Sequence, residues 1–255
     1  MTTYGFRPEP DSPLHWSFEA LLQSKMVPQV AGDVDLRPFT SARHNQRATS
    51  SCVAQATVKA LEIKRIQKYG ATAHLDLSRL AVYYLARELM NPPECTKDNG
   101  TYISHAFDVL RRFGVPPETA WPWDVTKIYT PPSWMAMRKA YLHKITAFYK
   151  IRSTGQARVQ AVIECLRANN PVVFGTIVGD NWHDYVAGQV LRLPSTETGR
   201  HATVIIGYKG GHFIGENSWG TAWGDNGFYL MEPEVVASSE SSDFWVPQMG
   251  IEVLR

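Results

Sequence analysis

Apolar residues recur at steps of three and four along residues 52–69. This repeat predicts a helix with one apolar stripe, which is typical of a helix packed against a core. Its members are Val53, Ala56, Ala60, Ile63 and Ile66. Gly70 follows directly and is a typical helix stop. The pattern therefore predicts a mostly buried helix that begins at Cys52.

The same pattern, with glycine or proline between segments, predicts further helices at residues 16–22, 77–90, 102–113, 133–143 and 156–168. After Pro171 the pattern changes to short runs rich in β-branched and aromatic residues. These runs predict strands at residues 172–178, 190–193, 201–208, 212–216 and 227–231. Helices followed by strands favour an α+β protein in which the two kinds of element are segregated.

Composition places the chain among ordinary globular proteins. It has 255 residues, 44% of them hydrophobic and 20% charged, which is enough to bury a substantial core. Its net charge of +2 is too close to balance to favour nucleic acid as a partner. No apolar run reaches the roughly 18 to 20 residues needed to span a bilayer, so we expect no membrane segment.

Cys52 is the first candidate for chemistry because it stands at the predicted start of a helix. The positive end of the helix dipole stabilises an anion there, so we expect this thiol to lose its proton more readily than a free one. A lone cysteine is otherwise a small buried hydrophobe, and that interpretation competes until a partner base is found.

His201 and Asn217 supply that partnership. His201 opens a predicted buried strand, and Asn217 follows a second one across the turn Lys209-Gly210-Gly211. Adjacent strands joined by a short turn would bring the two polar side chains together. A thiol nucleophile needs such a base and a third group that orients it. The separation of Cys52 and His201 along the sequence lies in the range of roughly 130 to 150 residues typical of papain and cathepsins, and the separation of Cys52 and Asn217 is slightly larger.

Two longer blocks make the resemblance specific. They read HATVIIGY from His201 and ENSWGTAWGDNGFY from Glu216, and both resemble the histidine and asparagine blocks of papain-like cysteine peptidases of the C1 family. Gln46 stands six residues ahead of Cys52, as the oxyanion-hole glutamine does in that family. The resemblance covers roughly residues 36–232. It implies a helical lobe carrying Cys52 and a β-rich lobe carrying His201, with the substrate in the groove between them.

The resemblance also implies roles for the site residues. Cys52 would attack a carbonyl carbon, while the Gln46 amide and the Cys52 backbone N–H would hold the oxyanion. His201 would protonate the leaving amine, Asn217 would orient the imidazole, and Trp219 would shield that hydrogen bond. Around the substrate, Gly100 and Thr101 would offer backbone groups to an extended peptide. The pocket for the side chain two residues before the scissile bond would be lined by Tyr102, Gly175 and Ala202.

The cysteine block departs from the usual Cys-Gly-Ser-Cys-Trp of the family. Thr49-Ser50-Ser51-Cys52-Val53 stands in its place, and we expect Ser50 to crowd the approach to the thiol. With Cys52 reserved for catalysis and Cys165 on an apolar helical face, a reduced protein without disulfides is the simpler expectation. This form looks most like bacterial members of the family.

By this interpretation, one catalytic domain divides into an N-terminal extension (1–35), a mainly helical lobe (36–130) and a mainly β-rich lobe (131–255). The extension is proline-rich and too short to be the long inhibitory segment of many family members. It could pack against the cleft or the outer surface. Its extended character motivates the hypothesis that residues 1–30 inhibit the enzyme.

The function we expect is hydrolysis of peptide bonds through a thioester, with a peptide or protein as substrate. Three alternatives stay open: an acyl transferase or ligase with the same triad, a cell-wall amidase, and a non-catalytic scaffold that binds peptides.

No zinc-type pair spacing and no phosphate-binding glycine loop is present, so we expect no metal and no cofactor. His183, beside Trp182, is interpreted as part of a solvated loop. The chain start lacks the pattern of a signal peptide, which favours the cytoplasm or export without a classical signal. The sequence leaves the oligomeric state undetermined.

Overall fold

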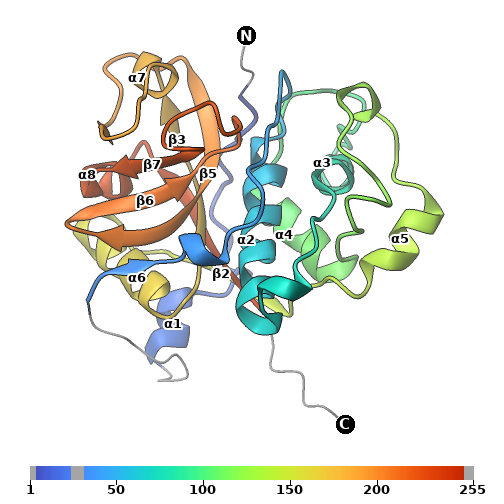
Figure 1. Ribbon diagram of the computed structural model, residues 1–255, viewed down its shortest axis with the longest axis horizontal. Helices are drawn as coiled ribbons and strands as arrows, with labels where there is room; N and C mark the ends of the chain where they lie inside the picture. The colour runs from blue at the N-terminus through green and yellow to red at the C-terminus, as the bar shows by residue number, and fades with distance from the viewer. Residues whose placement is uncertain (1–3, 24–31, 250–255) are drawn as a thin grey trace.

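A computed structural model describes residues 4–23 and 32–249. In Figure 1 the helices α2 to α5 gather on one side and a twisted sheet with its own helices on the other. The helical side comprises α2 (Cys52–Tyr69), α3 (Arg79–Glu88), α4 (Ile103–Arg112) and α5 (Trp134–Ala140). The other helices are α1 (Phe18–Gln23), α6 (Gly155–Arg167), α7 (Asp180–His183) and α8 (Pro233–Ala237).

The strands form one sheet in the order β2-β8-β3-β5-β6-β7-β4, and β1 also pairs with β5. Every pairing is antiparallel except that of β4 with β7. The strands are β1 (Val34–Asp35), β2 (Ala147–Lys150), β3 (Val172–Val178), β4 (Val190–Leu191), β5 (Gly199–Lys209), β6 (His212–Glu216), β7 (Phe228–Met231) and β8 (Ser242–Gln248).

Helix α2 joins the two sides, since it packs against β5 as well as α3 and α4. It begins and ends where the sequence predicts, and the Gly70 N–H donates to the Ile66 carbonyl, 2.9 Å away, to close its last turn. Gly70 has φ +85°, a conformation that glycine adopts at little cost. The apolar stripe is buried, and so are the polar residues Lys59 and Glu62.

The β5–β6 hairpin brings the two predicted polar residues together. The strands pair Val204 with Glu216, and the turn between them uses Gly210 and Gly211 at positive φ. Strand β3 pairs with the other edge of β5, so that Thr176 lies opposite His201. The predicted helices and strands are confirmed, with ends shifted by a few residues. The strand predicted at residues 190–193 is shorter than expected and comprises only Val190–Leu191 (β4).

Three strands were not predicted from the sequence: the two-residue β1, and β2 and β8. Strands β2 and β8 pair with each other, and β8 also pairs with β3. Both carry polar residues, and β8 contains Pro247, so neither shows the apolar run that marked the other strands. Their pairing depends on contacts between segments far apart in sequence.

Candidate active site

Cys52 opens α2 and is fully buried. Its Sγ accepts a hydrogen bond from the Ala202 backbone N–H, with a distance of 3.5 Å. Burial raises the pKa of the Cys52 thiol to about 11, although the amides of Ala202 and Gly5 act in the opposite direction. The expected easily ionised thiol is therefore wrong for this arrangement, because loss of solvent outweighs the helix dipole.

His201, on β5, is also fully buried. Its Nε2 lies 2.8 Å from Asn217 Oδ1, which also accepts from the Ser218 N–H at 2.7 Å. Because that oxygen can only accept, His201 carries its proton on Nε2. The other ring nitrogen, Nδ1, is buried and makes no hydrogen bond within the described part of the chain. It is therefore available to take a proton.

The pKa of His201 is lowered to about 4. Burial is the main cause and the neighbouring His183 adds to it, while the hydrogen bond to Asn217 opposes the shift. The Trp219 ring lies against His201 with centroids 5.0 Å apart. This indole covers the imidazole beside its bond to Asn217. Burial therefore favours the neutral thiol and the neutral imidazole in this arrangement.

Gln46 is buried beside the start of α2. Its Oε1 accepts from Ser218 Oγ at 2.7 Å, and its Nε2 donates to the Thr49 carbonyl at 2.9 Å. Its backbone N–H also donates to the Ser218 carbonyl, 2.8 Å away. Gln46 therefore ties the loop before Cys52 to the segment that follows Asn217.

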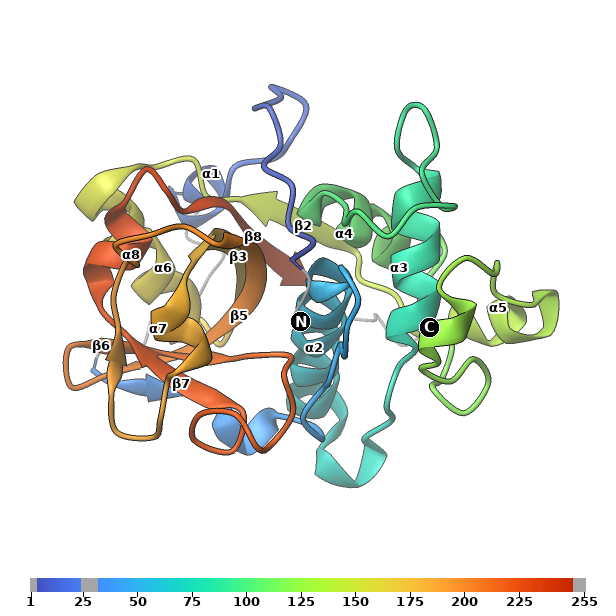
Figure 2. The ribbon, with the colours of Figure 1, turned by 90° about the horizontal axis from the view of Figure 1, so that it is seen from above.

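The groove between the two sides is filled by the chain's own N-terminal segment, residues 4–7. In Figures 1 and 2 this dark blue segment runs between α2 and the sheet. The Gly5 carbonyl accepts from the Thr101 N–H at 3.0 Å, and the Arg7 N–H donates to the Thr101 carbonyl at 3.3 Å. The Phe6 N–H donates to the Arg200 carbonyl, also at 3.3 Å. Residues 1–3 and 24–30 of the predicted inhibitory segment lie outside the described residues.

Glycines line the path of this segment. A Cβ on Gly100 would lie 1.9 Å from the Gly5 carbonyl oxygen, and a Cβ on Gly175 would lie 2.1 Å from the Phe6 ring. Phe6 is only 4% exposed. The predicted substrate positions Gly100, Thr101 and Gly175 therefore all contact the N-terminal segment.

The remaining predicted pocket residues lie around it. Ala202 is buried and holds Cys52 Sγ through its N–H. Tyr102 lies near the outer end, where the Arg7 guanidinium is 5.5 Å from its ring centroid. No contact joins its ring to Phe6 among the interactions described.

His183 is exposed, as the interpretation of a solvated residue expects, but it lies in the short helix α7 and contributes to the site. It ends α7, and its imidazole stacks on Trp219 with centroids 5.3 Å apart and planes 5° apart. It also hydrogen-bonds the Tyr4 hydroxyl. The sequence shows only that His183 follows Trp182, so nothing local revealed the stacking.

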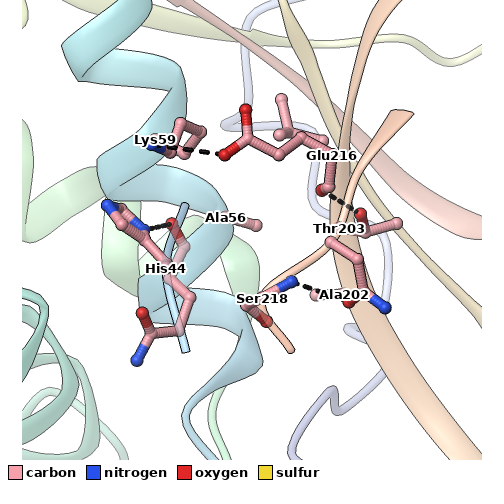
Figure 3. Close-up of a pocket in the computed structure, with 10 residues that line it drawn as sticks. His44, Ala56, Lys59, Ala202, Thr203, Glu216 and Ser218 are labelled. Atoms are coloured by element: carbon pink, nitrogen blue, oxygen red, sulfur yellow. Dashed lines mark hydrogen bonds and ion pairs between the residues drawn. The ribbon is translucent and has the colours of Figure 1, made fainter. Parts of the chain in front are cut away.

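A buried ionic cluster lies next to Asn217, and Figure 3 shows its Lys59–Glu216 pair. Lys59 on α2 lies 3.3 Å from Glu216, the residue before Asn217, and 3.4 Å from Glu62. Burial raises the pKa of Glu216, with Lys59 and Arg43 opposing. Burial also acts against ionisation of Glu62, but Lys59, Ser41 and His44 hold the pKa of that carboxyl well below its usual range. The sequence analysis missed this cluster.

Beside the cluster is a cavity of about 10 Å³, lined in part by Gln55, Glu216 and Asn217. A cavity of that size has room for about one water molecule. Gln55 Oε1 and Asn217 Nδ2 make no hydrogen bond within the described residues.

Over residues 4–23 and 32–249, no three His, Cys, Asp or Glu side chains are grouped so that they could hold a metal ion. No helix in these ranges has the length and apolar character required to cross a bilayer. All three cysteines are free, which confirms the expected absence of disulfides.

Comparisons with known proteins agree with this architecture. Xylellain, a cysteine protease from Xylella fastidiosa, superimposes with a TM-score of 0.83 and 26% identity, covering 98% of this chain and 97% of that one. The Carica candamarcensis cysteine protease CMS1MS2 shares the fold, with a TM-score of 0.68 and 20% identity over 87% of this chain and all of that chain.

Two relatives match in sequence over most of this chain. A peptidase C1-like protein of Acanthamoeba polyphaga mimivirus is 28% identical over 89% of this chain and 78% of its own length. Cathepsin K of Gallus gallus is 27% identical over 88% of this chain and 64% of its own. The profile described as papain family cysteine protease matches residues 31–244. The chain therefore belongs to the papain family of cysteine proteases and is a papain-like cysteine peptidase with a two-lobed α+β fold.

Proposed function

We propose that this chain cleaves peptide bonds through a thioester on Cys52. The observation that carries the proposal is the state of His201: Nε2 is bonded to Asn217 Oδ1 at 2.8 Å, while Nδ1 is buried without a partner. The adjacent Ala202 amide contacts Cys52 Sγ at 3.5 Å. A fixed imidazole with one unprotonated nitrogen can accept the thiol proton.

The proposed reaction has two steps. Cys52 Sγ bonds to the carbonyl carbon as its proton passes to His201, and the oxyanion is held by the Cys52 N–H and the Gln46 amide. The C–N bond then breaks, and the leaving amine takes the proton from His201. Water, deprotonated by the same imidazole, attacks the thioester and releases the acid and the thiol.

We further propose that the described arrangement is a latent form. The group of the N-terminal segment that acts on the Cys52 thiol is the Gly5 amide, which opposes the rise in the pKa of that thiol. The Gly5 carbonyl oxygen is bonded instead to the Thr101 N–H. Phe6 pairs with Thr101 in parallel. The segment therefore occupies the groove in which a substrate would bind, and it must leave before a substrate can enter.

One experiment tests both proposals. Residues 1–7 are deleted, which leaves the bond from the Glu9 N–H to Asp243 and the ion pair of Asp11 with Arg152 in place. We expect faster hydrolysis of a fluorogenic peptide amide than with the full chain, and a peptide thioester on Cys52 detectable by mass spectrometry after acid quench.

The control is the same deletion carrying Cys52→Ala, which must be inactive. Activity that survives in this control would remove Cys52 from the mechanism. Equal rates for the deleted and full-length proteins, both with a thioester on Cys52, would instead reject latency alone. Adding a free amine to the reaction separates hydrolysis from acyl transfer, because a transferase would give mainly the amide product.

A further inference from the structure

The Tyr4 side chain occupies a slot formed by residues that were not among the predicted substrate-binding residues. A Cβ on Gly199 would lie 2.1 Å from the Tyr4 ring, so the ring packs directly against the backbone where β5 begins. The Tyr4 hydroxyl bonds His183 and lies 3.4 Å from Thr198 Oγ1. His183 and Thr198 thus meet the hydroxyl at the end of a slot that has Gly199 as its floor.

This slot lies on the leaving-group side of the nucleophile. Along the segment, Phe6 fills the pocket at Gly175, Gly5 contacts Cys52, and Tyr4 comes beyond them. The Tyr4 ring also meets His201 edge-on, with centroids 6.3 Å apart. A residue just after the scissile bond of a substrate would have to pass this same imidazole.

The slot is held in shape by rigid neighbours. His183 is stacked on Trp219, and Trp219 in turn packs edge-on against Trp223 at 5.3 Å. Trp223 Nε1 donates to the Trp182 carbonyl at 2.7 Å, which ties this aromatic group to α7. The imidazole that meets the phenol hydroxyl is therefore preorganised, which reduces the entropy lost on binding.

We propose that His183, Thr198 and Gly199 form a side-chain subsite that selects tyrosine as the first residue after the scissile bond. This inference rests on the proposed peptidase function and names a substrate class for it. Gly199 has no side chain and so leaves space for an aromatic ring. The His183 imidazole and the Thr198 hydroxyl at the end of the slot distinguish the phenol of tyrosine from the ring of phenylalanine. Tyr4 is the occupant of this subsite when the groove is closed.

The test uses the full chain and two peptides in one reaction, identical except for tyrosine or phenylalanine after the scissile bond. Each carries phenylalanine two residues before that bond, to suit the pocket that Phe6 fills. The ratio of the two products does not depend on the fraction of enzyme that is open, because both peptides compete for the same open groove. We expect the tyrosine peptide to be favoured by roughly three- to tenfold, the effect of one net hydrogen bond.

The variants His183→Leu and Thr198→Val should bring this ratio towards one. His212→Leu, a histidine on β6 that pairs with Glu232, is the matched control and should leave the ratio unchanged. Any general loss of activity cancels in the ratio. Equal cleavage of both peptides by the unmodified chain would overturn the subsite while leaving the peptidase function intact.

A second measurement does not require peptide hydrolysis. Alkylation of Cys52 by iodoacetamide reports how often the N-terminal segment leaves, so Tyr4→Phe should accelerate labelling of the full chain by a similar factor. The same substitution should have no effect in the His183→Leu background, where the hydroxyl has lost its main partner. Acceleration without peptide cleavage would support the slot and reject the proposed function, and unchanged labelling would reject the slot.

Discussion

Replacing Gly5 with alanine should open the latent enzyme. The new Cβ would lie 1.7 Å from the Ser50 carbonyl oxygen and 2.3 Å from its carbon. Both are backbone atoms just ahead of α2, so they cannot rotate away as a side chain would. Ser50 is also fixed by Asp98, which accepts from its N–H at 2.9 Å and from its Oγ at 3.0 Å.

The expected rise in the open fraction follows from the contacts that the new Cβ would disturb. Relieving the clash must shift Gly5 away from Ser50, which strains its bond to Thr101 at 3.0 Å and the seating of Phe6. Inserting one carbon into a well-packed site typically costs about 1–3 kcal/mol. At 1.4 kcal/mol per factor of ten, the ratio of open to closed protein should rise by about 5- to 150-fold.

The assay is alkylation of Cys52 in the full chain, followed by intact mass, in parallel with hydrolysis of a fluorogenic peptide amide. Both rates should rise together in Gly5→Ala, because both require the segment to leave. Pro10→Ala is the control, since Pro10 is exposed and lies beyond the groove contacts of residues 4–7. If Gly5→Ala stays folded yet labels no faster than the unmodified chain, the reasoning about the closed groove is refuted.

Three further outcomes follow from the same contacts. His201→Ala should lower kcat/KM in the activated enzyme by roughly 10²- to 10⁴-fold, as loss of a general acid–base does, and an unchanged value would remove His201 from the mechanism. Lys59→Met leaves Glu62 and Glu216 without their shared cation, so denaturant unfolding should show a loss of about 3–5 kcal/mol, with part regained when Glu216→Gln is added. Acid should open the groove: burial lowers the pKa of His201 from its usual 6.5 to about 4, and departure of the segment removes part of that burial, so the closed form loses stability as pH falls below 6.5 and the loss is complete near 4. Between pH 7 and 5 the open fraction should rise, by about 20-fold if the shift is relieved in full, measured as activity regained at pH 7 immediately after acid treatment, and a flat profile would contradict the role of the segment in burying this imidazole.

Latency and reactivity are linked through solvent. With residues 4–7 in the groove, burial holds the thiol neutral, with a pKa of about 11, and the imidazole neutral, with a pKa of about 4. Departure of the segment returns water to both groups, and the helix dipole at Cys52 then acts without the opposing desolvation. We therefore expect the acidic thiol predicted from the sequence to exist in the open enzyme.

Local patterns determined much of this fold. The helix at residues 52–69 was predicted with both ends correct, because its apolar repeat and its stop at Gly70 depend only on residues close together in the sequence. The β5–β6 hairpin was predicted for the same reason, since two apolar β-branched runs flank a glycine turn. Once the hairpin forms, His201 and Asn217 must lie close together. The side chains of the candidate triad could therefore be identified from the sequence alone.

The tertiary structure decided the rest, because the deciding contacts join segments that no local pattern connects. Strand β2 is a strand because it pairs with β8, and β8 because it pairs with β2 and β3, all far apart along the chain. Lys59 has no sequence signal that directs it to Glu216, and His183 has none that directs it to Trp219. Above all, occupancy of the groove by residues 4–7 depends on glycines far away in sequence that leave space for it. That occupancy removes water from Cys52, which reverses the acidity that its place on the helix predicts.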